Sequence, residues 1–158
     1  MPHNLAVTPE PRTAPERKAG TIAKLEALEA DVWVATASPA GLAHLVPLSY
    51  AWDGEHIIIA TEPKLLTARN IAASGVARFG FGPTRDVVLV DAVLERTVDV
   101  ADAPPEMAER YASQADWDPR LEKDPMVFFL LRPVRVQAWR EANELAGRTL
   151  MRDGTWLV

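Results

Sequence analysis

Cysteine is absent from this chain of 158 residues. The sequence therefore excludes disulfides, thiolate metal sites, iron–sulfur clusters and a cysteine nucleophile. Histidine is also scarce, since His3, His44 and His56 are the only three. A site built from several histidines has too few ligands here, so we expect no bound metal.

Long apolar runs are missing as well. No segment is long and apolar enough to cross a bilayer, and the first twenty residues lack the apolar block of a secretory signal. We therefore expect a cytoplasmic protein with no membrane segment. The formal net charge of −5 argues against a nucleic-acid partner, because affinity for phosphate backbones comes chiefly from Lys and Arg.

The length suits one domain, and no internal repeat is present. Proline and charge are frequent near the start, which predicts a flexible N-terminal arm over residues 1–14 and a single domain over residues 15–158. Apolar residues at helical spacing (Ile22, Leu25, Leu28) predict an amphipathic helix over 15–30.

The rest of the chain is mostly β in pattern. Runs rich in β-branched and aromatic residues predict strands over 32–37, 42–52, 57–61, 76–81, 87–100 and 126–140. Asp53-Gly54 predicts a hairpin between the second and third strands, and Asp153-Gly154 a terminal hairpin of 148–151 with 155–158. Further helices are expected over 64–74, stopped by Gly75, and from an N-capping Asp102 to about residue 115, with Met107 and Tyr111 on its inner face.

This order lacks the regular strand–helix alternation of a parallel sheet. It predicts a mainly β protein with peripheral helices, built as an antiparallel barrel. Pro47 and Pro133 interrupt two strands and indicate edges or bulges, because proline cannot donate a ladder hydrogen bond. Such edges and apolar faces favour a homodimer.

The segment 60–71 gathers the polar groups best suited to a ligand: Thr61, Lys64, Thr67, Arg69 and Asn70. A phosphate ester needs charge neutralisation and several oriented donors, which a guanidinium, an ammonium, hydroxyls and helix N-terminal amides supply. The alternative is an ordinary solvated helix with exposed charges.

Several features in this order resemble the pyridoxamine 5′-phosphate oxidase-like family. They are Val46-Pro47, Asp53-Gly54, a strand ending in Thr61, Ala68-Arg69-Asn70-Ile71 and the closing strand over 133–140. The resemblance runs from about Asp31 to Trp139. It implies an antiparallel split β-barrel of the FMN-binding type and a homodimer with a cofactor at each of two interface sites.

The resemblance also implies the cofactor and its ligands. The cofactor is FMN or the 5-deazaflavin coenzyme F-420. Its phosphate is held by Thr61, Thr67, Arg69 and Asn70, with Lys64 as a nearby cation. Its ring lies beside the strand residues Val46, Pro47, Leu48 and Ser49. The cofactor of the neighbouring subunit is reached by Trp139 and Arg140, and the alternative for Trp139 is a place in the interface core. Relatives that use deazaflavin often carry lysine where this chain has Thr67, so the choice of cofactor stays open.

The implied activity is hydride transfer between the cofactor and a small organic substrate by an oxidoreductase. The alternatives are a non-catalytic protein that binds flavin, haem or another tetrapyrrole, and a nucleic-acid- or peptide-binding barrel without a cofactor, which the acidic charge disfavours. His44 is the one candidate imidazole acid or base and also suits a simple strand position. The sequence identifies no catalytic residue.

Overall fold

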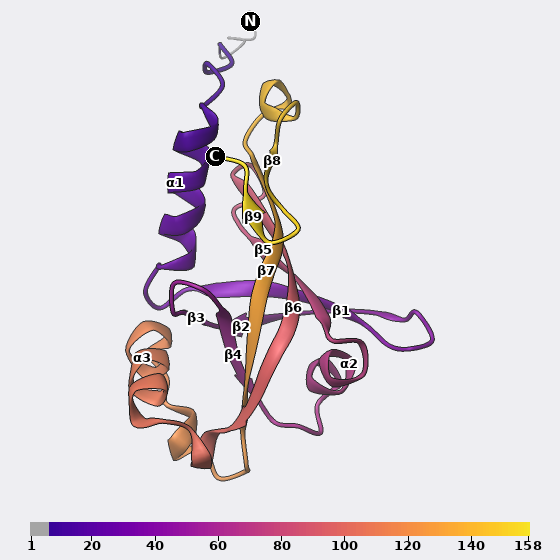
Figure 1. Ribbon diagram of the computed structural model, residues 1–158, viewed down its shortest axis with the longest axis vertical. Helices are drawn as coiled ribbons and strands as arrows, with labels where there is room; N and C mark the ends of the chain where they lie inside the picture. Colours follow the sequence, from indigo (N-terminus) through magenta and orange to yellow (C-terminus); the bar gives the residue numbers. More distant parts are fainter. Residues whose placement is uncertain (1–6) are drawn as a thin grey trace, which may run out of the picture.

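The computed structural model describes residues 7–158 (Figure 1). Residues 1–6 of the expected arm lie outside the described residues. The elements in chain order are α1 (Ala14–Leu25), β1 (Asp31–Ala37), β2 (Ala43–Ser49), β3 (Ala51–Trp52), β4 (Ile57–Thr61), α2 (Leu66–Ser74), β5 (Val76–Phe81), β6 (Val87–Asp99), η1 (Val100–Asp102), α3 (Pro105–Ala115), η2 (Pro119–Leu121), β7 (Val127–Trp139), η3 (Ala142–Glu144), β8 (Thr149–Arg152) and β9 (Thr155–Trp156).

The strands form one antiparallel sheet in the order β2-β1-β5-β6-β7-β4-β3, with the β8–β9 hairpin attached to β7. The end strands β2 and β3 are not hydrogen-bonded to each other, so the barrel is split. The long strands β6 and β7 shift register at Asp91/Ala92 and at Leu94/Arg96, and such bulges bend strands. The predicted antiparallel split β-barrel with peripheral helices is confirmed.

Strand β4 is buried on both faces, which explains its unbroken apolar sequence. Ile57 and Ile59 belong to the main core inside the barrel. Ile58 and Ala60 belong to a second core, which α3 covers with Tyr111. Figure 1 shows α3 and α2 on opposite sides of the strands, with α1 along the upper part.

Helix α1 is shorter than the sequence predicts. It ends at Leu25, and Leu28, expected on its buried stripe, is 72% exposed. The Gln114 amide of α3 donates to the carbonyls of Leu25 and Ala27 at 2.7 and 3.2 Å, which satisfies the end of the helix. Glu29 then turns the chain with a positive φ of 55°.

The predicted pairing of the second strand was partly wrong. Residues 43–49 pair with β1, and only Ala51–Trp52 pair with β4. The break falls at Tyr50, whose buried side chain donates a hydrogen bond to the carbonyl of Lys24. Strand β2 therefore lies at the edge of the sheet, where Pro47 was expected.

The predicted cap on the third helix was also wrong. Asp102 belongs to the short η1, and α3 begins after Pro104 without a side-chain cap. Pro105 begins the helix because its fixed φ suits the first helical turn. Pro133 adjoins a bulge, as predicted. Among residues 7–158, no helix is long and apolar enough to span a membrane.

Candidate functional site

The start of α2 is an open helix terminus. Its N-cap residue, Leu65, is extended and provides no side-chain hydrogen bond. The first backbone amide to bond back to the cap is that of Arg69, which reaches the Leu65 carbonyl at 3.0 Å. The amides of the first turn have no intrahelical partner and carry the positive end of the helix dipole. This terminus can therefore accept an anion.

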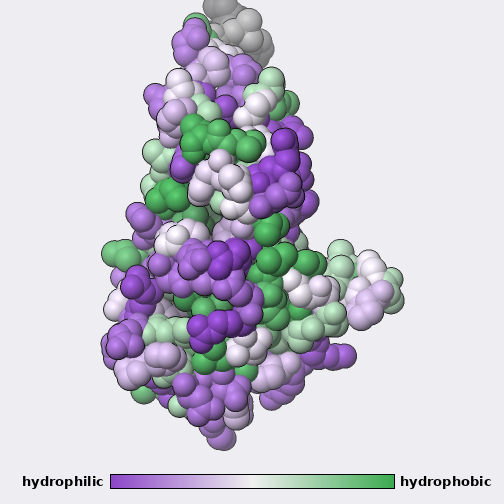
Figure 2. Space-filling view, in the orientation of Figure 1, coloured by the Kyte–Doolittle hydropathy of each residue, from purple (hydrophilic) through white to green (hydrophobic). Residues whose placement is uncertain are grey.

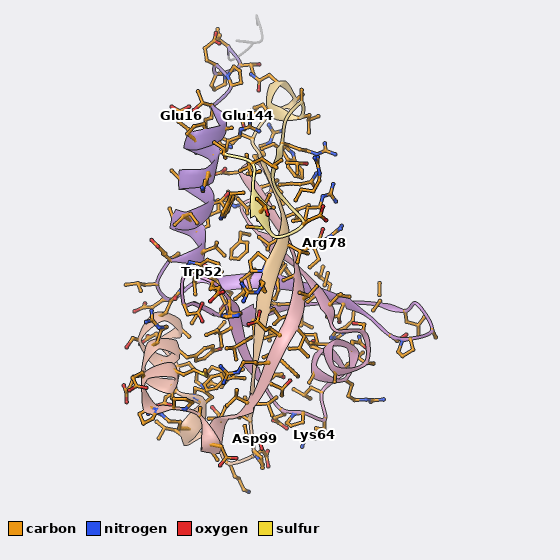
Figure 3. The ribbon with its side chains drawn as sticks, viewed as in Figure 1. Glu16, Trp52, Lys64, Arg78, Asp99 and Glu144 are labelled. Atoms are coloured by element: carbon orange, nitrogen blue, oxygen red, sulfur yellow. The ribbon has the colours of Figure 1, made fainter. Side chains whose placement is uncertain are left out.

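Two cations flank this terminus and differ in how they are engaged. The Arg69 side chain is exposed and forms no ion pair within the described residues 7–158. Lys64 is 73% exposed, and its Nζ lies 3.1 Å from the Glu62 carboxylate, which raises the pKa of Lys64. Figure 3 shows Lys64 at the lower end of the molecule, below α2. Of these two cations, Arg69 is the one whose charge is not neutralised by a carboxylate among the described residues.

The other polar residues of the segment point inward. Thr61, Thr67 and Asn70 are buried, with exposed fractions of 4, 5 and 3%. Asn70 Nδ2 donates to Thr36 Oγ1 of β1 at 3.1 Å. Asn70 thereby fastens α2 to the sheet through its side-chain amide nitrogen. Thr36 was not predicted, because it lies 34 positions away in sequence and no local pattern marks the contact.

Strand β2 lies beside α2. Helix α2 packs against both β1 and β2. In the β1–β2 register His44 lies opposite Thr36, and Val46 lies opposite Val34. Cross-strand partners share a face of the sheet, so His44 and Val46 lie on the face that α2 covers.

The remaining residues of β2 differ in exposure. Leu48 and Ser49 are half-buried, whereas Pro47 is exposed at the sheet edge. The structure therefore brings β2 and α2 together in one chain.

Trp139 and Arg140 lie elsewhere. Trp139 is the last residue of β7, and Arg140 follows it. Figure 1 shows β7 running up away from α2, which lies at the lower right. Arg148 stacks over the Trp139 ring with its guanidinium carbon 5.3 Å from the ring centroid. Arg140 Nε lies 3.2 Å from Asp86. Within one chain these two residues do not join the α2 site.

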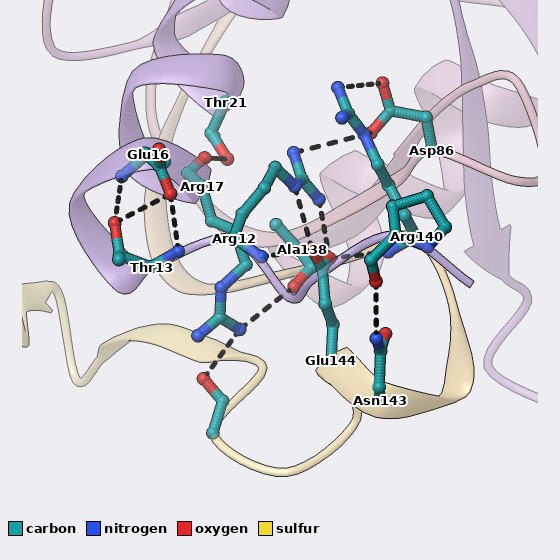
Figure 4. Close-up of polar contacts among 12 residues, drawn as sticks. Arg12, Thr13, Glu16, Arg17, Thr21, Asp86, Ala138, Arg140, Asn143 and Glu144 are labelled. Carbon is teal, nitrogen blue, oxygen red and sulfur yellow. Dashed lines mark hydrogen bonds and ion pairs between the residues drawn. The ribbon is translucent and has the colours of Figure 1, made fainter. Parts of the chain in front are cut away.

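The end of β7 is held by a dense polar cluster instead (Figure 4). Arg12 Nε and Nη2 donate to the Glu144 carboxylate at 3.0 and 2.8 Å, and the backbone amide of Arg140 donates to it at 2.8 Å. These bonds lower the pKa of Glu144 to about 2, with the Arg12 side chain as the main cause. These paired charges join the residues before α1 to the turn after β7, so the cluster is structural.

His56 anchors a second polar network that the sequence analysis missed. Its Nδ1 lies 2.9 Å from Asp53 and its Nε2 3.1 Å from Glu95. Arg132 in turn pairs with Glu95 and, at 2.6 Å, with Glu55. Burial opposes the charged ring, but the hydrogen bond to Asp53 and the nearby Glu95 carboxylate outweigh it and raise the pKa of His56.

A shallow groove of about 550 Å³ crosses the outer face of the sheet beside α2. Its lining includes Ala35, Thr36, Ser74, Val76, Arg78 and Val93. Neighbouring apolar side chains on β1 and β2 are also exposed, with Trp33 at 51% and Leu45 at 59%. Hydrophobic residues reach the surface where the β1–β2 hairpin leaves the body of the molecule (Figure 2). This outer face is more apolar than a fully solvated sheet needs to be.

No protein-family model matches the chain, and no curated protein sequence matches it. Solved structures do. An F420 reductase aligns with a TM-score of 0.60 and 21% identity, covering 72% of this chain and 94% of that chain. A Listeria innocua protein assigned as a pyridoxamine 5′-phosphate oxidase aligns at 0.59 and 11% identity, over 78% of this chain and 98% of its own.

A haem-binding protein from Mycobacterium smegmatis aligns with a TM-score of 0.59 and 20% identity, over 94% of this chain and 60% of its own. At these identities the likeness establishes the fold. The chain has the split β-barrel fold of the pyridoxamine 5′-phosphate oxidase-like proteins.

Proposed function

We propose that this chain, a split β-barrel of the pyridoxamine 5′-phosphate oxidase-like type, binds FMN or the deazaflavin coenzyme F-420 by its phosphate at the start of α2. The observation that carries the proposal is the uncapped terminus of α2 beside an arginine that forms no ion pair among the described residues. Both features leave positive charge without a partner among the described residues.

The residues present fit a phosphate ester. First-turn amides of α2 and the Arg69 guanidinium supply charge-assisted donors, and Lys64 adds a further cation once it leaves Glu62. Thr61 and Thr67 are buried beside this segment, so in this proposal they support it from the inside. Asn70 acts by positioning, because its amide already bonds to Thr36 and so fixes the helix that presents the donors.

The ring of the cofactor would lie along β2. Val46 and Leu48 provide apolar contact, and the free edge of β2 provides backbone groups near Pro47 and Ser49. In this proposal a second copy covers the apolar outer face and brings its own Trp139 and Arg140 to the cofactor. The distance between those residues and α2 within one chain supports a site shared between two subunits.

A bound flavin or deazaflavin supplies the hydride chemistry, and the protein contributes binding, orientation and exclusion of water. We propose an oxidoreductase that transfers a hydride between this cofactor and a small organic substrate. Because the cofactor would supply the chemistry, the protein needs no group of catalytic side chains, and none is evident among the described residues of β2 and α2.

A parallel fluorescence titration with FMN and F-420 tests the proposal, because both compounds fluoresce. We expect saturable binding of one of them with one site per chain, together with a dimeric mass in solution. Failure of both compounds to bind contradicts the proposal. Turnover with a reductant and an electron acceptor then separates an enzyme from a carrier.

The alternative function is non-catalytic binding of haem or another tetrapyrrole. The similarity to a haem-binding protein and the position of His44 beside α2 favour it as the second candidate. An imidazole nitrogen is a common axial ligand of haem iron. Haem binding that produces a Soret band and is lost in His44→Ala, without binding of either flavin, would support this alternative.

A further inference from the structure

A separate cavity lies between α1, the β3–β4 turn and the β8–β9 hairpin. Its volume is about 320 Å³, within the range of small-ligand sites. It shares no lining residue with the outer groove and contains none of the residues assigned to the phosphate site. In Figure 3 its wall residue Trp52 lies below the end of α1, away from Lys64.

Two indoles and several aliphatic side chains line this cavity. Trp52 and Trp156 are both half-buried against the main core, so their rings are held in place. Ile22, Pro133 and Met151 complete the apolar lining. Aromatic faces carry negative electrostatic potential and attract cations.

The charged residues at the cavity are predominantly acidic. Glu26 and Glu55 line it, together with Arg132. The Arg132 charge is already engaged by Glu55 and Glu95, whereas Glu26 has no ion pair in the part of the chain that the structure describes. The cation among the lining residues, Arg132, is already paired, so an anionic ligand would meet a mainly acidic lining.

Lys18 already places an ammonium group over the Trp156 ring. Its Nζ lies 4.8 Å from the ring centroid and also donates to the Val158 carbonyl at 2.7 Å. Lys18 precedes Ile22 and the C-cap residue Glu26 at intervals of about one helical turn, so the three residues follow one side of α1 to its end. The cavity therefore extends along α1 from the Lys18 ammonium group to the Glu26 carboxylate, which has no ion pair among the described residues.

From this arrangement we propose that the cavity binds a small organic cation of the quaternary ammonium class, with its methyl groups against Trp52 and Trp156 and its charge beside Glu26. A methylated ammonium fits better than a primary amine, because it keeps the charge but gives up few hydrogen bonds to water when it enters an apolar cavity.

Choline and its uncharged isostere 3,3-dimethylbutan-1-ol provide the test, measured by isothermal titration on the full chain. We expect choline to bind and the alcohol to bind at least about tenfold more weakly, because only the charged ligand gains the cation–π attraction. Equal affinities, or no binding of choline, would overturn the proposal.

Variants then locate the site. Trp156→Leu should weaken choline binding about tenfold, Glu26→Gln should weaken it severalfold, and Lys18→Met should strengthen it by removing a neighbouring positive charge. Trp33→Leu, on the outer face, is the matched control and should leave choline affinity unchanged.

Glu26 is exposed, so its variant will fold even if a tryptophan variant does not. Choline affinity that is unchanged in Glu26→Gln contradicts the assignment. Flavin titration of the same variants keeps this test separate from the phosphate site.

Discussion

Helices α1 and α2 begin in opposite ways. At α1, Thr13 Oγ1 accepts from the Glu16 amide at 3.3 Å, and the Glu16 carboxylate accepts from the Thr13 amide at 2.7 Å. This reciprocal capping box satisfies two amides that the helix itself cannot. At α2 the N-cap is Leu65, and no side chain caps the helix. The first terminus is complete within the chain, and the second leaves donors for a ligand.

The arginines near the two helices show the same contrast. Arg17 is 7% exposed, and its Nη1 donates to the Gly147 carbonyl at 3.0 Å, while Arg12 is paired with Glu144. Arg69 is exposed and has no ion pair among residues 7–158. Groups around α1 stabilise the fold, whereas those around α2 remain available for binding. The following variants test this division.

The largest effect on stability is expected at Glu144. Its side chain is 3% exposed, and Glu144→Gln removes the charge that holds Arg12. We expect the free energy of unfolding to fall by about 3 kcal/mol, as for other buried pairs that lose one partner. Urea denaturation measures this loss.

The pH dependence of that loss has a definite sign. Because the folded pKa of Glu144 is about 2 against an ordinary value of 4.5, its contribution is present above pH 4.5 and disappears as the pH falls toward 2. The difference between wild type and Glu144→Gln should shrink over that range. Glu109→Gln, which removes an exposed partner of Arg120, is the control and should change stability little.

A smaller loss is expected from the contact that fastens α2. Asn70→Ala and Thr36→Val each remove one side of a buried hydrogen bond, and each should cost about 1–2 kcal/mol. In a double-mutant cycle the two losses should be coupled by about 1 kcal/mol. Strictly additive losses would show that the contact does not stabilise the helix.

His56 should make stability depend on pH. Because its folded pKa is raised, its contribution is complete below the ordinary value of 6.5 and is lost as the pH rises through the folded pKa. The neutral ring has one N–H and cannot donate to Asp53 and Glu95 together. Thermal unfolding of wild type should show this decline above pH 6.5, and the decline should be weaker in His56→Gln. Equal pH dependence in both proteins contradicts the assignment.

The smallest effects are expected at Lys64, which is exposed and paired with Glu62. Lys64→Ala should leave stability unchanged and weaken cofactor binding severalfold. Glu62→Gln should strengthen cofactor binding, because it frees Lys64 and removes a negative charge near the phosphate. Titration of both variants with the cofactor that binds wild type measures these changes, and shifts in the reverse direction would place the phosphate elsewhere.

Local patterns predicted most of the fold. Gly75 ends α2 in the left-handed region with a φ of 71°, and the Asp153-Gly154 hairpin formed where expected. The errors arose from distant contacts. Gln114 ends α1 at Leu25, and the burial of Tyr50 separates β2 from β3. Neither contact leaves a periodic or turn signal in the sequence.

Contacts between distant residues also limited the prediction of the site. The segment from Thr61 to Asn70 stood out by composition, but composition does not reveal which side chains point outward. The structure separates the exposed Arg69 from Asn70, which is committed to Thr36. The His56 network joins the β3–β4 turn to β6 and β7, so no single stretch of sequence could have indicated it.

Arg69→Ala tests the central claim most directly, measured by titration with FMN and F-420. Arg110→Ala is the control, because Arg110 is also an exposed helical arginine without an ion pair in the described part of the chain. We expect Arg69→Ala to keep the wild-type stability and to lose at least about tenfold in cofactor affinity, the value of one charge-assisted hydrogen bond. Arg110→Ala should bind like wild type. Wild-type affinity in Arg69→Ala, or an equal loss in both variants, would contradict a phosphate site at the start of α2.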